Sequence, residues 1–270
     1  MFSLDGYKAV DLSPRIIPRI NRLDGSVEEG KPDPYGHHWV MWEGRFPPDN
    51  SLFTVYAAPK GISIYGALQD DDILGRERMT SHLGSHVQAG KGHISHWKGV
   101  TEEMKGIWEM DLSTFMGEAA VCNLPHLKPK AVEEESDYPK EYPKKKFWLP
   151  KAEPGDIRGQ EILPEHLDNV QKGDIVLMTS PFSGLEQPWL SSRTAKWLIE
   201  DRKMKMLGLG YPGIEWQYDL KVAAPDNSPI RRMLLGANIP IVHPLVNIEN
   251  ISSDRVFFYG APLNVPKLEA

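Results

Sequence analysis

The chain has 270 residues, of which 40% are hydrophobic and 25% are charged, with a formal net charge of −6 and one cysteine. This length can bury a substantial core and fits one large domain, expected to span residues 1–270. The modest negative charge gives no reason to expect nucleic acid as a partner, and no apolar run is long enough for a membrane-spanning helix. One cysteine permits no internal disulfide, and Met1–Asp5 lacks a basic-then-apolar signal, so a cytoplasmic location is the default expectation.

The first predicted elements are the two strands of a hairpin, Leu52–Tyr56 and Gly61–Tyr65, with Pro59 and Lys60 near the turn. Aromatic side chains precede this hairpin at Trp39 and Trp42. Two roles stay open for them: stacking on a flat substrate ring, or anchoring the core or a dimer.

Four of the nine histidines lie in one short segment, namely His82, His86, His93 and His96. Imidazole is the commonest metal ligand near neutral pH. Gly84 and the β-branched Val87 argue against a regular helix, so a loop or bent strand is predicted here. In extended backbone, Gln88 points to the same face as His86. The segment therefore suggests a metal site, with ordinary surface or core histidines as the alternative.

Residues 128–154 are rich in Lys, Glu and Pro and predict an insertion on the surface. Its run Lys144–Lys146 is interpreted as a solvated face, with phosphate binding as the alternative. Cys122 follows the apolar residues Ala119–Val121, so it is expected to be a small buried hydrophobe.

The second half of the chain is predicted to contain further strands around Val176, at Ile239–Val242 and at Val256–Tyr259. One helix is predicted over residues 190–201, because Leu190, Thr194, Trp197, Leu198 and Asp201 recur at helical spacing. Ser191 and Ser192 can cap its beginning. The chain is therefore expected to be mixed α and β.

The histidine segment resembles the signature H-x-G-[TS]-H-x-D-x-P-x-H of the metal-dependent cyclase family. That family includes bacterial kynurenine formamidase, isatin hydrolase and related ring-opening hydrolases. Residues His82, Gly84, Ser85 and His86 match in register, whereas Gln88 replaces the expected Asp.

The end of the signature also departs from the family pattern. Gly90 replaces the expected Pro, and the last histidine would fall on Gly92. A short insertion would instead place that histidine at His96, which we favour, with His93 as the near rival.

Four further segments resemble family strands: Val10–Ser13, Gly173–Thr179, Leu234–Val242 and Ala261–Leu263. The resemblance therefore covers most of the chain. It implies an α/β (α+β) protein with the swivelling β/β/α fold of the family, in a single domain.

The resemblance also implies a ligand set, with departures. Two-metal members carry a His and a Glu twelve residues apart near the C-terminus, and the same spacing here joins Arg231 and His243. Gln88 stands in place of the bridging Asp, and Arg231 cannot ligate because it has no lone pair. We therefore expect one divalent ion per chain, Mn or Zn, held by His82, His86, Gln88 and also His243. A metal-free relic is the alternative.

The function implied by the resemblance is metal-assisted hydrolysis of a small cyclic substrate. A cyclic 1,3-diketone, opened at a C–C bond as in dihydrophloroglucinol cyclohydrolases, is the favoured substrate. A lactam or aryl formamide, opened at C–N, is the runner-up. A non-catalytic binding protein on a cyclase scaffold is the alternative from another class.

The resemblance further assigns roles to individual residues. His96 would handle protons and Arg231 would bind an anionic oxygen. The place of the family's variable substrate loop is taken by residues 211–218, where Tyr211 and Glu215 are catalytic candidates and Tyr218 a substrate contact. Trp39, Trp42 and His93 are the other expected substrate contacts. A homodimer or homotetramer is expected, since the Trp-rich N-terminal segment would be partly exposed in a monomer.

Overall fold

A computed structural model gives the structure of the chain, and it describes residues 6–15, 17, 19–22, 24–31, 40–46, 51–57, 84–95, 97, 99–133, 154–210, 228–264 and 266. Six strands form the central sheet in the order β14-β6-β10-β12-β13-β5. Their bounds are β5 His86–Gln88, β6 Met116–Asn123, β10 Ile175–Thr179, β12 Met206–Leu209, β13 Ile241–His243 and β14 Arg255–Tyr259. The strands predicted around Val176, at 239–242 and at 256–259 are thereby confirmed.

The four middle strands run parallel, and β5 and β14 pair antiparallel at the two ends of the sheet. Every residue of β10 and β12 is buried. Such continuous burial is typical of parallel strands that are covered on both faces. Val176 and Met178 pack into the apolar cluster on one face, whereas Ile175 and Leu177 pack into the cluster on the other.

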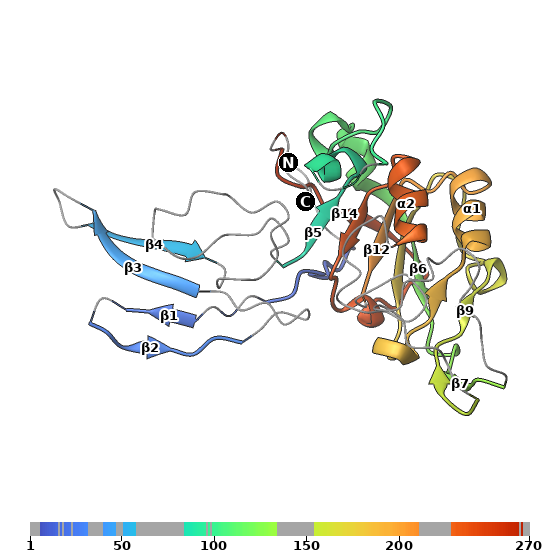
Figure 1. Cartoon of the computed structure of the whole chain (residues 1–270), viewed down its shortest axis with the longest axis horizontal. Helices are drawn as coiled ribbons and strands as arrows, with labels where there is room; N and C mark the ends of the chain where they lie inside the picture. Colours follow the sequence, from blue (N-terminus) through green and yellow to red (C-terminus); the bar gives the residue numbers. More distant parts are fainter. Residues whose placement is uncertain are drawn as a thin grey trace.

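Two helices cover the first of these faces, α1 (Ser192–Glu200) and α2 (Pro229–Gly236) (Figure 1). The predicted helix over 190–201 is confirmed as α1, and Ser191 caps it by accepting a hydrogen bond from the Thr194 amide at 3.3 Å. Proline at the first position of α2 is favourable, because its fixed φ suits a helix that begins there. Three short 3-10 helices contribute buried residues to the second face: η2 (Ile107–Glu109), η3 (Leu112–Phe115) and η7 (Ile248–Asn250).

A second sheet has the order β2-β1-β3-β4 and extends away from the large sheet in Figure 1. Its strands are β1 Arg19–Asn21, β2 Val27–Glu28, β3 Val40–Phe46 and β4 Ser51–Ala57. The predicted strand at 52–56 is therefore confirmed, but its antiparallel partner among the described residues is β3. The predicted partner Gly61–Tyr65 lies outside the described residues. Pro47, Pro48, Asp49 and Asn50, which join β3 to β4, are the turn signal that indicates this hairpin.

Short elements complete the described fold. Strand β7 (Lys130–Ala131) pairs with β8 (Ile157–Arg158), and β9 (Glu161–Ile162) pairs with β11 (Trp189–Leu190). The β7–β8 pair brings together the two ends of the predicted insertion, whose residues 134–153, with Lys144–Lys146, lie outside the described residues. Among the described helices, none has the length and apolar character that crossing a bilayer requires.

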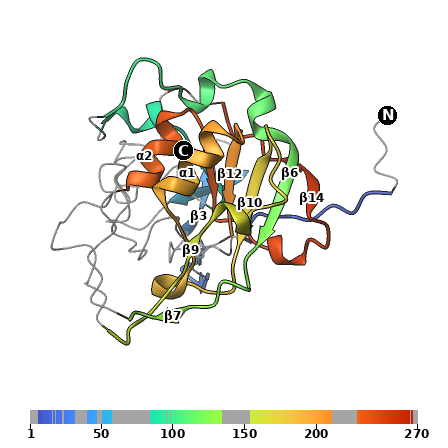
Figure 2. The same cartoon turned by 90° about the vertical axis from the view of Figure 1, so that its right-hand side faces the viewer.

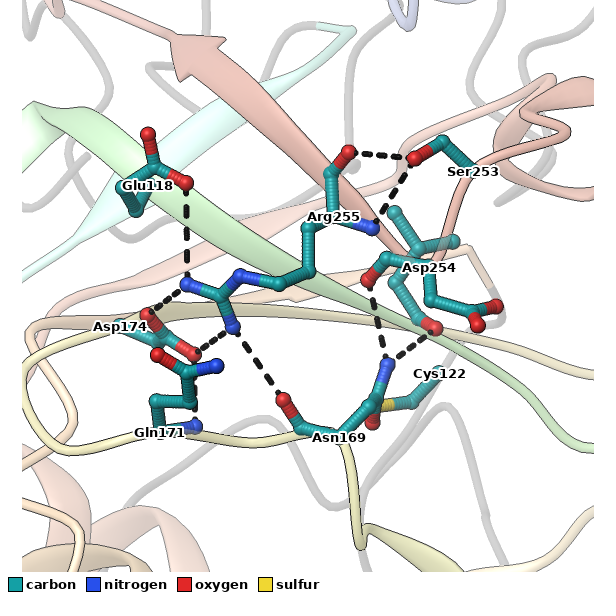
Figure 3. A network of polar contacts seen from close by, with 9 residues as sticks. Glu118, Cys122, Asn169, Gln171, Asp174, Ser253, Asp254 and Arg255 are labelled. Carbon is teal, nitrogen blue, oxygen red and sulfur yellow. Dashed lines mark hydrogen bonds and ion pairs between the residues drawn. The ribbon is translucent and has the colours of Figure 1, made fainter.

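A polar network ties β14 to the loop that precedes β10 (Figure 3). Arg255 donates two hydrogen bonds of 2.8 Å to the buried carboxylate of Asp174, and these bonds raise the pKa of the Arg255 guanidinium. The same carboxylate accepts from the Gln171 amide at 2.7 Å. The Asn169 side-chain amide donates to the Val121 and Asp254 carbonyls at 2.9 and 3.2 Å. A bidentate pair of this kind fixes geometry as well as charge.

This network predicts a large stability effect at Asp174. Asp174→Asn removes the charge that holds Arg255, so we expect a loss of about 2–3 kcal/mol in the free energy of unfolding, measured by urea denaturation. Arg193→Ala is the control, because its ion pair with Glu161 is exposed and spans 3.6 Å, and it should cost under about 0.5 kcal/mol. Equal losses in the two variants would contradict this assignment.

Candidate metal site

The register of β5 on β13 places two of the predicted ligands side by side. His86 and His243 are direct cross-strand partners, and their ring centroids lie 4.5 Å apart. Both side chains are buried. The Ser85 hydroxyl donates to the Pro244 carbonyl at 2.7 Å, which holds the beginning of β5 against the end of β13. The pair therefore lies at the carboxyl end of β13, the edge where open α/β sheets bind their ligands.

The orientation of the His86 ring is fixed by the backbone. Its Nδ1 lies 2.9 Å from the Gly84 carbonyl oxygen, which can only accept, so Nδ1 carries the proton. In the neutral ring Nε2 then carries the lone pair. A carbonyl on the far nitrogen is the usual second contact of a metal-binding histidine. Gly84 has φ of +60°, a left-handed conformation that favours glycine at this position.

Gln88 adds an oxygen donor on the same face of β5. Alternation along the strand points the side chains of residues 86 and 88 to one side of the sheet. The Gln88 Oε1 atom is buried and has no hydrogen-bond partner in the part of the chain that the structure describes. A buried amide oxygen without a partner is costly, on the order of 1–3 kcal/mol, so its retention needs an explanation such as a bound ion. These donors fit a metal that accepts nitrogen and oxygen.

His93 is fully buried in η1 (Gly90–Ser95). Its Nδ1 lies 2.9 Å from the Ala89 carbonyl oxygen, so the proton is on Nδ1, as in His86. The His93 and Trp97 rings lie nearly perpendicular to each other, with centroids 6.5 Å apart. The favoured His96 lies outside the described residues, so the choice between His93 and His96 stays a prediction.

Arg231 lies in the first turn of α2 and is buried. Helix α2 packs against η1, the element that follows Gln88 in the chain. The structure thus brings the helix that carries Arg231 to the histidine segment.

Six of the predicted site residues lie outside the described part of the chain: His82, His96, Trp39, Tyr211, Glu215 and Tyr218. Trp42 lies in β3, where its backbone pairs with Val55. Within the described ranges, no group of three His, Cys, Asp or Glu side chains is arranged to hold a metal ion. The described donors alone therefore make an incomplete ligand set, which His82 would have to extend.

Cys122 plays no part in this site. It is buried in β6, and burial, together with Asp168, Asp174 and Asp254, raises the pKa of its thiol to about 12. A thiol with such a pKa is protonated at neutral pH and is neither a ligand nor a nucleophile. The expectation of a small buried hydrophobe is confirmed.

A glycine contact that sequence reasoning missed joins the signature segment to α2. A Cβ atom on Gly90 would lie 2.9 Å from the Leu235 carbonyl oxygen and 3.2 Å from the Met104 sulfur. The signal for this contact in the sequence is Gly90 in place of the signature proline, because glycine has no side chain to obstruct a close approach of two backbones.

The fold and the site together define a mixed α/β protein with a histidine pair at the edge of its sheet. The Cyclase family model matches residues 10–215, so the chain belongs to this family. The predicted resemblance and the predicted fold class are thereby confirmed. A search among curated proteins found no match.

Solved structures agree on the fold. Isatin hydrolase A from Labrenzia aggregata, bound to benzyl benzoate, is 16% identical with a TM-score of 0.56, covering 96% of this chain and 89% of that one. Isatin hydrolase A from Ralstonia solanacearum is 14% identical with a TM-score of 0.55, covering 96% and 87%. A protein from Bacillus stearothermophilus, described as a predicted metal-dependent hydrolase, is 15% identical with a TM-score of 0.50, covering 95% and 90%. At these identities the similarity is one of fold.

The close approach at Gly90 generates a stability prediction. Gly90→Ala must push β5 and η1 away from the α2 backbone, so we expect a loss of about 1–3 kcal/mol in the free energy of unfolding. Gly236→Ala is the matched control, because its Cβ would meet only the Met104 methyl carbon at 3.6 Å, an ordinary contact. Thermal denaturation of both variants checks this, and an unchanged midpoint for Gly90→Ala would refute it.

Proposed function

We propose that the protein is a metal-dependent hydrolase that opens a small cyclic substrate. The observation that carries this proposal is the set of donors on one face of β5 and β13. His86 and His243 lie side by side, and Gln88 keeps a buried oxygen without a partner among the described residues. Membership in the Cyclase family and a fold shared with isatin hydrolases support the same reading.

The donor chemistry favours a particular kind of ion. His86 and His243 offer imidazole nitrogen and Gln88 an amide oxygen, and His82 would add a further imidazole. Such a neutral set suits Zn or Mn, and the only thiol of the chain, Cys122, is protonated. When bound, the ion polarises a carbonyl and lowers the pKa of bound water. One ion per chain is proposed, because a second cation would be repelled by the fixed charge of Arg231.

The chain's own residues would bind the substrate and move its proton. The guanidinium of Arg231 would bind an anionic substrate oxygen through its planar fork of donors. A neutral histidine at the end of the signature would accept a proton from water at Nε2. His93 could accept this proton, because its Nδ1–H donates to the Ala89 carbonyl, and the same hydrogen bond would stabilise the imidazolium that forms. His96 remains the favoured alternative for this role.

The proposed substrate is a cyclic 1,3-diketone, which is acidic and binds as an enolate. The bound enolate first takes a proton at the carbon between its two carbonyl groups, which restores the electrophilic diketone, and the carboxylic acid formed later gives back this proton. Hydrolysis then forms a C–O bond between water and one ring carbonyl carbon and breaks the adjacent C–C bond. The electron pair of that bond remains as the enolate of the second ketone, which takes the proton that the water lost. Trp39, Trp42 and Tyr218 would wall the ring, and Tyr211 and Glu215 would assist the proton transfer.

Hydrolysis of a lactam or an aryl formamide is the alternative within the enzyme class. The isatin hydrolases that share the fold favour it, since isatin itself contains a lactam ring. A non-catalytic binding protein is the alternative from another class, and it predicts no bound metal. Hydrolysis assays with a cyclic 1,3-diketone and with a lactam or aryl formamide, each on metal-loaded protein, would distinguish C–C cleavage, C–N cleavage and the absence of catalysis.

The first prediction of this proposal concerns metal content. Protein purified without chelator should contain one divalent ion per chain, and His86→Ala should lose most of it, since one ligand is removed. His126→Ala is the control: this exposed histidine contacts the His166 ring instead, and its loss should leave the metal content unchanged. Elemental analysis gives the readout. Two tightly bound ions per chain, or full metal content in His86→Ala, would contradict the proposal.

The second prediction concerns Arg231. Arg231→Ala should keep its metal but lose about 2–4 kcal/mol of transition-state stabilisation in kcat/KM, the range for one lost oxyanion contact. Arg231→Lys should recover only part, because an ammonium does not reproduce the fork. Arg232→Ala, on the neighbouring half-buried residue, is the control.

A purely structural Arg231 would give the opposite pattern. If Arg231 serves only an ion pair, for example with Asp226 outside the described residues, the variant would melt earlier and keep its activity per folded molecule. That outcome would remove Arg231 from the substrate site.

A further inference from the structure

Gln187 is a buried polar residue that the proposed mechanism does not use. It is 2% exposed, and it follows the short 3-10 helix η5 (Gly184–Glu186) in the segment that joins β10 to α1. Neither its Oε1 atom nor its Nε2 atom has a hydrogen-bond partner in the part of the chain that the structure describes. A buried carboxamide without partners is costly, so its retention indicates a polar group that comes from outside the chain.

Backbone contacts hold Gln187 in place. Its amide donates to the Gly184 carbonyl at 3.4 Å, and the Gly159 amide donates to the Leu185 carbonyl at 2.9 Å. A Cβ atom on Gly159 would overlap the Gln187 carbonyl oxygen, so only glycine allows this close approach. The Trp189 indole donates to the Gly159 carbonyl at 3.1 Å. The segment that carries the carboxamide is therefore tied to the residues that precede β9.

This segment lies beyond the carboxyl ends of the parallel strands. The Trp189 amide donates to the Gln160 carbonyl at 3.1 Å, and the Gln160 side chain donates to the carbonyl of Lys128, which follows β6. In Figure 2 the arrow of β6 points down, toward the part of the chain that holds β7. Gln187 itself follows β10 in the chain. Open α/β sheets bind their ligands at this edge, which also carries His243.

The candidate metal donors and the Gln187 segment belong to the same face of the sheet. Val87 and Val242 pack into the apolar cluster on the second face. The donors next to them in β5 and β13 therefore point to the first face, which α1 and α2 cover. Leu190, shortly after Gln187, packs into the cluster of that first face. Strands β10 and β13 are two strand spacings apart, roughly 10 Å, a distance that a six-membered ring with a contact at each end can span.

We propose that Gln187 is a specificity-determining residue, which binds the side of the substrate ring opposite the two ketones. This inference rests on the proposed function. The metal ion and Arg231 would take the two diketone oxygens, which leaves Gln187 for a third, uncharged substituent. A hydroxyl group fits, because it can donate to Oε1 or accept from Nε2. A carboxylate would place its charge beside the acceptor Oε1, and an ammonium would face the donor Nε2. The substrate is thus a cyclic 1,3-diketone with a hydroxyl group remote from both ketones.

Kinetics on two matched substrates test the proposal, namely cyclohexane-1,3-dione and its 5-hydroxy derivative, each on metal-loaded protein. The wild-type chain should prefer the hydroxy compound by about tenfold or more in kcat/KM, because the analogue without the hydroxyl leaves a buried amide unpaired. Gln187→Met keeps the length of the side chain and removes both hydrogen-bonding atoms, so it should abolish the preference, mainly through KM. Gln160→Met is the matched control. It loses the hydrogen bond to Lys128 and should keep the wild-type preference.

Each outcome bears on the proposal separately from the proposed function. Hydrolysis of both diketones without a preference in the wild type, or with a preference that Gln187→Met keeps, would overturn the role of Gln187 and leave the hydrolase proposal standing. If neither compound is hydrolysed, the proposed function fails, and calorimetric titration supplies the same comparison as binding affinities. A preference that Gln187→Met loses would then support the role of Gln187, whereas no binding of either compound would overturn it.

Thermal denaturation shows whether Gln187 has a structural role instead. Gln187→Met breaks no described hydrogen bond of the side chain, so the variant should melt no earlier than the wild type. Earlier melting together with an unchanged substrate preference would overturn the proposal.

Discussion

The antiparallel pairing of β5 on β13 is the interaction on which the candidate site depends. It joins two residues that are 157 positions apart in the chain, His86 and His243, and makes their rings neighbours. Because strand side chains alternate between faces, a shift of one residue would turn His86 and Gln88 to the other face. The Ser85–Pro244 hydrogen bond and the close approach of Gly90 to α2 both hold this register. The chemistry of the site is thus a consequence of backbone pairing at the end of the sheet.

Gln88 and Arg231, the two departures from the family pattern, both change the charge expected at the site in the positive direction. Loss of a carboxylate at position 88 removes one negative charge, and Arg231 adds a fixed positive one where the family resemblance expects an imidazole. Each change alone would leave the site with unbalanced charge next to two cations. In the proposed site the two changes together suit one cation and one anionic substrate oxygen, since the guanidinium would take the electrostatic place of a second ion. This is why the proposed substrate is an acidic ring that binds as its enolate.

Local patterns predicted the elements that depend on local physics. Helix α1 and the buried strand β10 follow from helical spacing, a serine cap and a continuous apolar run, and the structure has both. The pairing of β4 with β3 was not predicted, because Gly61–Tyr65 also has a strand-like pattern and competes with Val40–Phe46 as the partner, although residues 47–50 carry a turn signal. The His86–His243 contact lies beyond local reasoning, since nothing near either residue encodes its partner. Only the family resemblance, which assigned both positions to one ligand set, indicated it.

The two edge strands of the central sheet, β5 and β14, differ in the side chains that they carry. The β5 edge gathers buried donors, whereas the β14 edge is braced by the Arg255–Asp174 pair and leaves two aromatic residues exposed. Five strand spacings of about 4.8 Å separate these edges, roughly 24 Å. The Arg255 guanidinium therefore lies far from the buried donors of β5, so a change at one end of the sheet is expected to act independently of a change at the other.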